Sequence, residues 1–170
     1  MLDERRDLFT PFPQGRQLEP DDEFYYGEQD DYYFYIDEQG NLVLYTNGAT
    51  VWNKNHTIMA NGTGLWGGTF GYQSCIIVQQ PGSSGFYYIF TVEPDHKPKG
   101  LNYSIVDMSL AAGNGSVVSK NVPLYSDSLY EQISATRHCN GRDIWIVVHQ
   151  FHTDIFRSYL LTPSGVSLIP

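Results

Sequence analysis

The chain has 170 residues and a formal net charge of −9. The charge is local, because residues 1–40 hold twelve acidic residues and three arginines while residues 41–170 hold seven acidic and seven basic residues. This length supplies one ordinary core, and a neutral body without a basic stripe argues against nucleic acid as a partner.

Residues 1–31 form the first predicted region, an acidic leader. Prolines, tyrosines and like charges in this stretch predict a flexible segment. Its carboxylates between residues 21 and 31 leave calcium binding open, although the spacing of a calcium-binding loop is missing. The chain shows no apolar stretch typical of an export signal at its start, and no run of about 18 apolar residues that would predict a membrane span.

From residue 32 onward the chain is rich in aromatic residues and glycine, and its β-prone segments recur in groups of four. The first group is predicted to have strands at residues 32–37, 41–46, 49–53 and 56–59. The second group is predicted to have strands at residues 73–79, 86–92, 102–108 and 116–122. The third group is predicted to have strands at residues 132–137, 143–149, 155–162 and 165–170. The sequence therefore predicts an all-β fold built from repeated four-stranded units.

The second strand of each group is nearly continuous in apolar residues, as in LVLY, YYIF and IWIVV. This pattern predicts burial on both faces, because a strand with one wet face would alternate apolar and polar residues. Repeats of four antiparallel strands that are covered on both sides are typical of β-propeller blades. The prediction is a partial β-propeller of about three four-stranded antiparallel blades, at about residues 32–60, 73–122 and 132–170, behind the flexible acidic leader.

Three blades do not close a propeller, which usually has about four to eight of them. The two end blades would each keep an open apolar face, comparable to the largest patches that monomers expose. We therefore expect either a fragment of a longer protein or self-association through the open blade faces.

Five ordered motifs span about residues 36–168: GNLVLYTNGATVWNKNHTIMANGTGLWGG, QSCIIVQQPGSSGFYYIFTV, GLNYSIVDMSLAAGNGSVVSKNVPL, SATRHCNGRDIWIVVH and YLLTPSGV. In these motifs the chain resembles the amino-terminal propeller region of large surface proteins of gliding bacteria. Those proteins commonly carry PKD-like or other adhesion modules and end in a type IX secretion sorting domain. The resemblance implies an extracellular or cell-surface location, although the export signal, the later blades and the sorting domain of that family are absent from this sequence.

The same resemblance implies a non-catalytic recognition or adhesion-associated module that binds a glycan or a protein, and it carries over no catalytic residue. One alternative is a fragment of a glycan-processing propeller enzyme, in which Arg137, Arg142 and Arg157 would converge on one pocket. The conserved boxes of propeller sialidases are not found in the sequence, and fold alone does not license a reaction. Another alternative is a truncated gene product without a function of its own.

The candidate ligand-binding residues lie in two places. Trp52, Asn53, Asn55 and His56 would offer a stacking face and directed hydrogen bonds to a sugar or peptide. The alternative for this stretch is a turn in which the asparagines adopt left-handed or Asx geometry. Trp66 follows in a glycine-rich loop, which is either a ligand platform or a connection between blades that is pinned by its aromatic side chains.

The sequence predicts no catalytic residue, no metal ion and no cofactor. His149, His152 and Asp154 would cross a hairpin turn, where their spacing does not suit a metal site. Cys75 and Cys139 form no metal-binding motif, and their predicted positions in different blades are too far apart for a disulfide. Both cysteines are therefore predicted to be free thiols.

Overall fold

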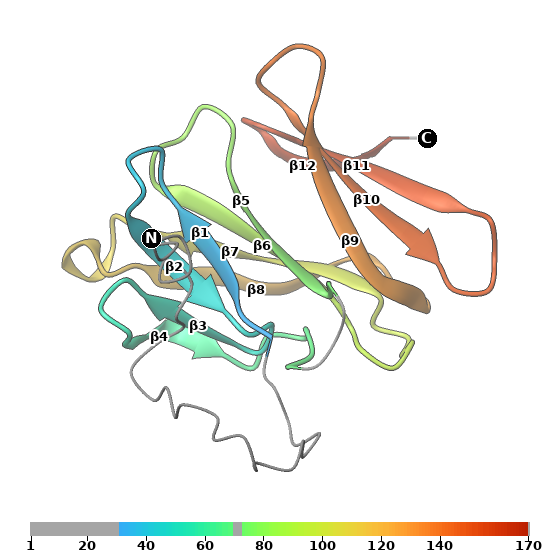
Figure 1. Ribbon diagram of the computed structural model, residues 1–170, viewed down its shortest axis with the longest axis horizontal. Coiled ribbons are helices and arrows are strands. Elements are labelled where there is room, and N and C mark those ends of the chain that lie inside the picture. The colour runs from blue at the N-terminus through green and yellow to red at the C-terminus, as the bar shows by residue number, and fades with distance from the viewer. Residues whose placement is uncertain (1–30, 70–72, 170) are drawn as a thin grey trace, which may run out of the picture.

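The computed structural model describes residues 31–69 and 73–169. The predictions about the leader, including its flexibility and the calcium alternative, therefore fall almost entirely outside the described residues. The described part is all-β (Figure 1), as the sequence predicts. Its strands are β1 (Tyr33–Ile36), β2 (Leu42–Thr46), β3 (Thr50–Asn53), β4 (Ile58–Thr63), β5 (Cys75–Gln79), β6 (Phe86–Val92), β7 (Leu101–Asp107), β8 (Ser116–Tyr125), β9 (Leu129–Arg137), β10 (Ile144–Gln150), β11 (Phe156–Thr162) and β12 (Gly165–Ile169).

These strands form three consecutive antiparallel meanders. Unit 1 consists of β1–β4, unit 2 of β5–β8 and unit 3 of β9–β12. A short 3₁₀ turn, η2 (Ala111–Gly113), precedes β8. Each strand overlaps the position predicted from the sequence, so the predicted strand positions are confirmed.

Units 1 and 2 are hydrogen-bonded into one eight-stranded sheet with the order β1-β2-β3-β4-β8-β7-β6-β5. The link is a parallel contact between β4 and β8, where Ala60 pairs with Ser116. The sheet is nearly closed, because its two edge strands meet: the Ser74 N–H donates to the Tyr33 hydroxyl at 3.1 Å, and the Tyr35 hydroxyl donates to Gln79 Oε1 at 3.0 Å. The sequence did not predict this joining of the first two units.

Side chains reinforce the junction between β4 and β8. Lys120 Nζ donates to Asn61 Oδ1 at 2.9 Å and to the Thr63 carbonyl at 2.8 Å. Asn61 Nδ2 donates to the Val117 carbonyl at 2.9 Å. The junction forms because β4 runs to Thr63, four residues beyond its predicted end, and so reaches the outer strand of unit 2.

Unit 3 forms a separate four-stranded sheet with the order β12-β11-β10-β9, and Figure 1 shows it beside unit 2 in orange and red. Among the described residues, one backbone bridge, between Gln73 and Gln132, links the segment before β5 to β9. The rest of the attachment is side-chain packing and loop contacts.

Unit 2 is covered on both sides. One core cluster lies between units 2 and 3 and contains Val78, Tyr88, Phe90, Val92, Leu101, Leu129, Ile133, Ile146, Val148, Tyr159 and Leu161. The other lies between units 1 and 2 and contains Leu44, Val51, Met59, Leu65, Cys75, Tyr87, Ile89, Val106 and Val117. Successive residues of β6 thus enter opposite cores, since side chains alternate along a strand. The predicted burial on both faces is confirmed for β6.

The same prediction is wrong for β10. Ile146 and Val148 are buried against unit 2, whereas Trp145, Val147 and His149 on the opposite face are only half-buried. The sequences of β6 and β10 are both nearly continuous in apolar residues, but of these two strands only β6 is covered by a sheet on each side.

Candidate functional site

The predicted polar cluster after β3 is a turn. Asn53 is buried, and its Oδ1 accepts hydrogen bonds from the Asn55 N–H at 2.9 Å and from Thr57 Oγ1 at 2.9 Å. This is Asx geometry, in which a side-chain carbonyl replaces a backbone acceptor. Asn53 therefore shapes the chain reversal between β3 and β4.

The next two candidates also have partners inside the protein. Asn55 Nδ2 donates to Asn114 Oδ1 at 2.9 Å, which connects this turn to the β7–β8 loop. His56 has a backbone φ of 60°, and its Nδ1 lies 3.3 Å from the Tyr45 hydroxyl. These contacts favour the alternative in which the stretch folds as a turn.

The two tryptophans lie apart. Trp52 stacks on Tyr45 with ring centroids 5.2 Å apart and 9° between the planes. Trp66 instead donates its backbone N–H to Asn121 Oδ1 and lies under Lys99 Nζ, which is 4.6 Å from its ring centroid. The structure groups Trp52 with the polar turn and places Trp66 in the connection between units 1 and 2.

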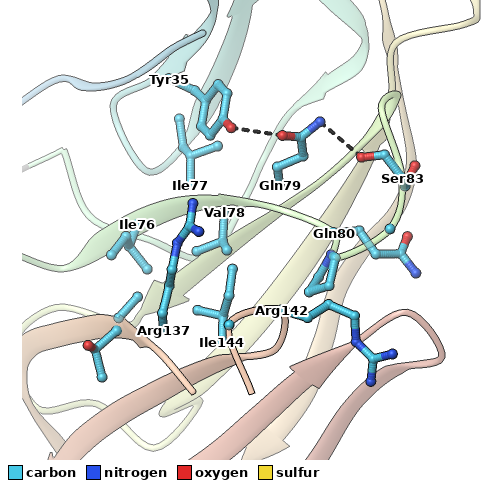
Figure 2. A pocket seen from close by; sticks show the side chains of 15 residues that line it. Tyr35, Ile76, Ile77, Val78, Gln79, Gln80, Ser83, Arg137, Arg142 and Ile144 are labelled. Atoms are coloured by element: carbon cyan, nitrogen blue, oxygen red, sulfur yellow. Dashed lines mark hydrogen bonds between the residues drawn. The ribbon is translucent and has the colours of Figure 1, made fainter. Parts of the chain in front are cut away.

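A different feature, which we call the inter-unit hollow, joins elements of all three units (Figure 2). It has a volume of about 490 Å³ and lies where β1, β5 and β9, the first strands of the units, approach one another. Its lining residues are Tyr35, Ile76, Ile77, Val78, Gln79, Gln80, Pro81, Gly82, Ser83, Ala135, Thr136, Arg137, Gly141, Arg142 and Ile144.

Fixed amides form one side of the inter-unit hollow. Gln79 accepts the Tyr35 hydroxyl through Oε1 and donates through Nε2 to the Ser83 carbonyl at 2.9 Å. Gln80 Nε2 donates to the Pro163 carbonyl of unit 3 at 2.8 Å. Burial raises the pKa of the Tyr35 phenol, the Glu38 and Asp37 carboxylates raise this pKa further, and the positive charge of Arg137 lowers it.

The two arginines of the hollow differ in their surroundings. Arg142 forms an ion pair with Asp143, with 2.8 Å between Nε and Oδ1. This pair and a hydrogen bond from Asn140 hold the pKa of the Asp143 carboxyl below its ordinary value. Arg137 has no ion pair or hydrogen bond from its side chain among the described residues. Figure 2 shows it extending from β9 toward Ile77, whereas the guanidinium of Arg142 points away.

Arg157 lies elsewhere. Its guanidinium carbon is 3.9 Å from the centroid of the Tyr125 ring, and its Nη2 donates to Gln150 Oε1 at 3.0 Å. The three arginines that the glycan-processing alternative would bring to one pocket therefore do not converge. Only Arg137 and Arg142 line the inter-unit hollow.

The remaining predictions concern metal binding, thiols and membranes. His149 Nε2 lies 2.7 Å from the Thr153 carbonyl, within the hairpin turn where it was predicted. The described residues contain no group of three His, Cys, Asp or Glu side chains that could hold a metal ion. Cys75 and Cys139 are free, as predicted, and burial raises the pKa of the Cys75 thiol. In residues 31–69 and 73–169 no helix is long and apolar enough to cross a membrane.

The inter-unit hollow was not predicted from the sequence. Its residues come from strands that are separated by more than 40 positions, and no local motif marks them. The one sequence feature that could have indicated the hollow is the pair Gln79 and Gln80, two polar residues at the end of an otherwise apolar strand.

The chain matches no family model, no curated protein and no solved structure. The resemblance to surface-protein propellers therefore stays a prediction. What supports a function is the geometry of the described residues.

Proposed function

We propose that the three units are blades of a β-propeller-type array, and that the array is a non-catalytic recognition module of a secreted or cell-surface protein, associated with adhesion. Three observations support this proposal. Each unit is a four-stranded antiparallel meander. The first strands of successive units lie beside each other, and a middle unit is covered by both neighbours. Propeller blades share these features.

The ligand site of this module is the inter-unit hollow, and its ligand is an acidic glycan. The observation that carries this proposal is Arg137, a permanent cation without an acidic partner among the described residues, facing a hollow with fixed amides. Guanidinium groups bind carboxylates and sulfates through paired, charge-assisted hydrogen bonds.

The chemistry of the lining favours binding over turnover. Glycoside hydrolysis usually requires two carboxyl groups placed on either side of the scissile bond. None of the 15 described residues that line the hollow is Asp, Glu, His or Cys. Arg142, the second cation, already pairs with Asp143.

Titration calorimetry with uronic-acid oligosaccharides tests the proposal, using Arg137→Met and a control, Lys54→Met. Lys54 is exposed and lies outside the hollow, so both variants lose one positive charge. Since hydrogen bonds to charged groups contribute about 1.5–3 kcal/mol, Arg137→Met should bind roughly tenfold to 100-fold more weakly. The control should bind like the wild type.

Three results would overturn the proposal. Equal affinity in Arg137→Met and the wild type would show that Arg137 does not hold the ligand. Release of reducing sugar ends by the wild-type chain would favour the alternative, a fragment of a glycan-processing enzyme. Failure of every acidic glycan to bind would favour a gene product without independent function.

A further inference from the structure

Unit 3 has a second face, which points away from unit 2. Cross-strand pairs place Trp145 opposite both Thr136 and Leu160, and Val147 opposite both Ser134 and Ser158. His149 lies opposite Phe156. Paired residues in an antiparallel sheet point to the same face, so these side chains form one surface, which we call the β9–β11 face. Two hollows of about 370 and 620 Å³ lie on it and share Val147 and Phe156.

This face is not built like the dry interfaces inside the protein. In β5, which has a sheet on both sides, Cys75 and Ile77 face unit 1 while Ile76 and Val78 face unit 3. In β9, the corresponding strand of unit 3, the apolar residues Ile133 and Ala135 face unit 2. The other face of β9 carries the polar side chains Gln132, Ser134 and Thr136, and Tyr130, whose ring lies 5.0 Å from the His149 ring.

The polar groups of the β9–β11 face retain their capacity to bind a ligand. Five of its hydroxyl or amide side chains make no hydrogen bond to any described residue: Gln73, Gln132, Ser134, Thr136 and Ser158. A dry sheet packed on this face would leave these groups without partners, at a cost of about 1–3 kcal/mol for each buried group. A ligand rich in hydroxyl groups would pair with them instead.

Aromatic rings lie at both ends of this polar middle. Phe156 is 65% exposed, and the His149 ring stacks on it at 4.4 Å with 10° between the planes. Trp145 lines the larger hollow. Trp145 and His149 are four residues apart on β10, which corresponds to about 13 Å along a strand. Exposed aromatic faces with nearby hydrogen-bonding groups suit the apolar faces and hydroxyl edges of sugar rings.

Charge indicates which class of ligand fits. The residues that line the two hollows include no Asp, Glu or Lys, and the one arginine, Arg157, is held by Gln150 and Tyr125. An acidic ligand would find no free cation here, in contrast to the inter-unit hollow. The face therefore suits an uncharged ligand.

The size of the face argues against a second copy of the chain as the occupant. Three strands of about seven residues cover about 330 Å², from a rise of about 3.3 Å per residue and a strand spacing of about 4.8 Å. Stable protein interfaces bury about 800 Å² on each partner. The face is large enough for an oligosaccharide and too small for a stable dimer.

We infer that the β9–β11 face of unit 3 binds a neutral oligosaccharide, stacked on Phe156 and Trp145 and hydrogen-bonded to the glutamine, serine and threonine side chains between them. This site is separate from the inter-unit hollow and does not require Arg137. The two sites would give the module two different glycan contacts.

The experiment measures binding of neutral cello-, xylo- and manno-oligosaccharides by calorimetry and by fluorescence of the three tryptophans. The variants are Phe156→Ala and Ser158→Ala, with Phe86→Ala as the matched control. Phe86 is 37% exposed, lies at the start of β6 and does not line either hollow. At least one of these oligosaccharides should bind, Phe156→Ala should weaken that binding about tenfold, and the control should leave it unchanged. Arg137→Met should also leave it unchanged, which separates this site from the proposed acidic-glycan site.

Three outcomes would overturn the inference: no binding of any neutral oligosaccharide to the wild type, equal loss of binding in Phe156→Ala and Phe86→Ala, or loss in Arg137→Met. A concentration-dependent dimer in sedimentation that Phe156→Ala dissolves would also overturn it, because a second copy would then occupy the face. Ser158→Ala keeps the test valid if Phe156→Ala perturbs the fold, since removal of one hydroxyl from a half-buried position leaves the packing intact.

Discussion

Truncation of Phe90 tests the two-sided packing of unit 2. Phe90 is fully buried between units 2 and 3, whereas Phe156, on the far side of unit 3, is 65% exposed. Phe90→Ala should lower the free energy of unfolding by about 3–5 kcal/mol, the usual cost of this change in a core. Phe156→Ala should change it by less than about 0.5 kcal/mol, as at other surface positions.

Equilibrium unfolding in urea, followed by tryptophan fluorescence, measures this difference. With a slope of about 2 kcal/mol per molar urea for a domain of this size, Phe90→Ala should lower the midpoint by about 2 M. Ile89→Ala should lower it by about 1–2.5 M, because Ile89 is fully buried on the opposite face of β6, against unit 1. Phe156→Ala should leave the midpoint nearly unchanged.

Equal midpoints for Phe90→Ala and Phe156→Ala would refute the packing between units 2 and 3. A large effect of Phe90→Ala together with no effect of Ile89→Ala would refute the second core, between units 1 and 2. Either result would mean that β6 is covered on one side only.

Three further predictions concern thiols, acid stability and glycines. A thiol reagent should modify only Cys139 in the native chain, and also Cys75 after denaturation; rapid modification of both would contradict the burial of Cys75. Since the pKa of Asp143 is lowered in the folded state, its stabilising contribution is complete above the unfolded carboxyl value of about 3.9 and is lost as pH falls through the folded value. Melting temperatures between pH 2 and pH 6 should therefore fall less steeply toward acid in Asp143→Asn; parallel curves would contradict this. Gly100→Ala should cost about 2–4 kcal/mol, because the added Cβ would collide with the Tyr125 carbonyl oxygen, whereas Gly40→Ala, also at a positive φ but with nothing within 4 Å, should cost about 1 kcal/mol. Equal denaturation midpoints for the two glycine variants would contradict the close approach at Gly100.

The strands of this protein could be predicted from the sequence because each carries its own local signal. Apolar runs such as YYIF and the Asn-Gly and Gly-rich turns between them predict strand positions and the grouping by four. The polar turn at Asn53 was likewise foreseeable as one of two alternatives, since an asparagine followed by polar residues often forms an Asx turn. Each of these signals lies within a few consecutive residues of the sequence.

The features that could not be predicted depend on which units meet. Nothing local in β4 shows that Ala60 will pair with Ser116 and join two units into one sheet. Arg137 gains its significance only because β1 and β5 approach β9. The sequence of β10 predicts burial on both faces, which is wrong. The error could have been detected in the neighbouring strand β9, because Gln132, Ser134 and Thr136 make one face of that strand polar.

The junction between β4 and β8 also makes units 1 and 2 more resistant to mechanical unfolding than unit 3. Units 1 and 2 are joined at their outer strands by a backbone pair and by the hydrogen bonds of Lys120 and Asn61. In the part of the chain that the structure describes, β12 pairs with β11 alone, so its bonds to β11 would break one after another under tension. Tension on the carboxyl end should separate the strands of unit 3 at low force, while units 1 and 2 stay folded. Under such tension the chain should therefore lose the β9–β11 face first, and binding through that face should be released before units 1 and 2 unfold.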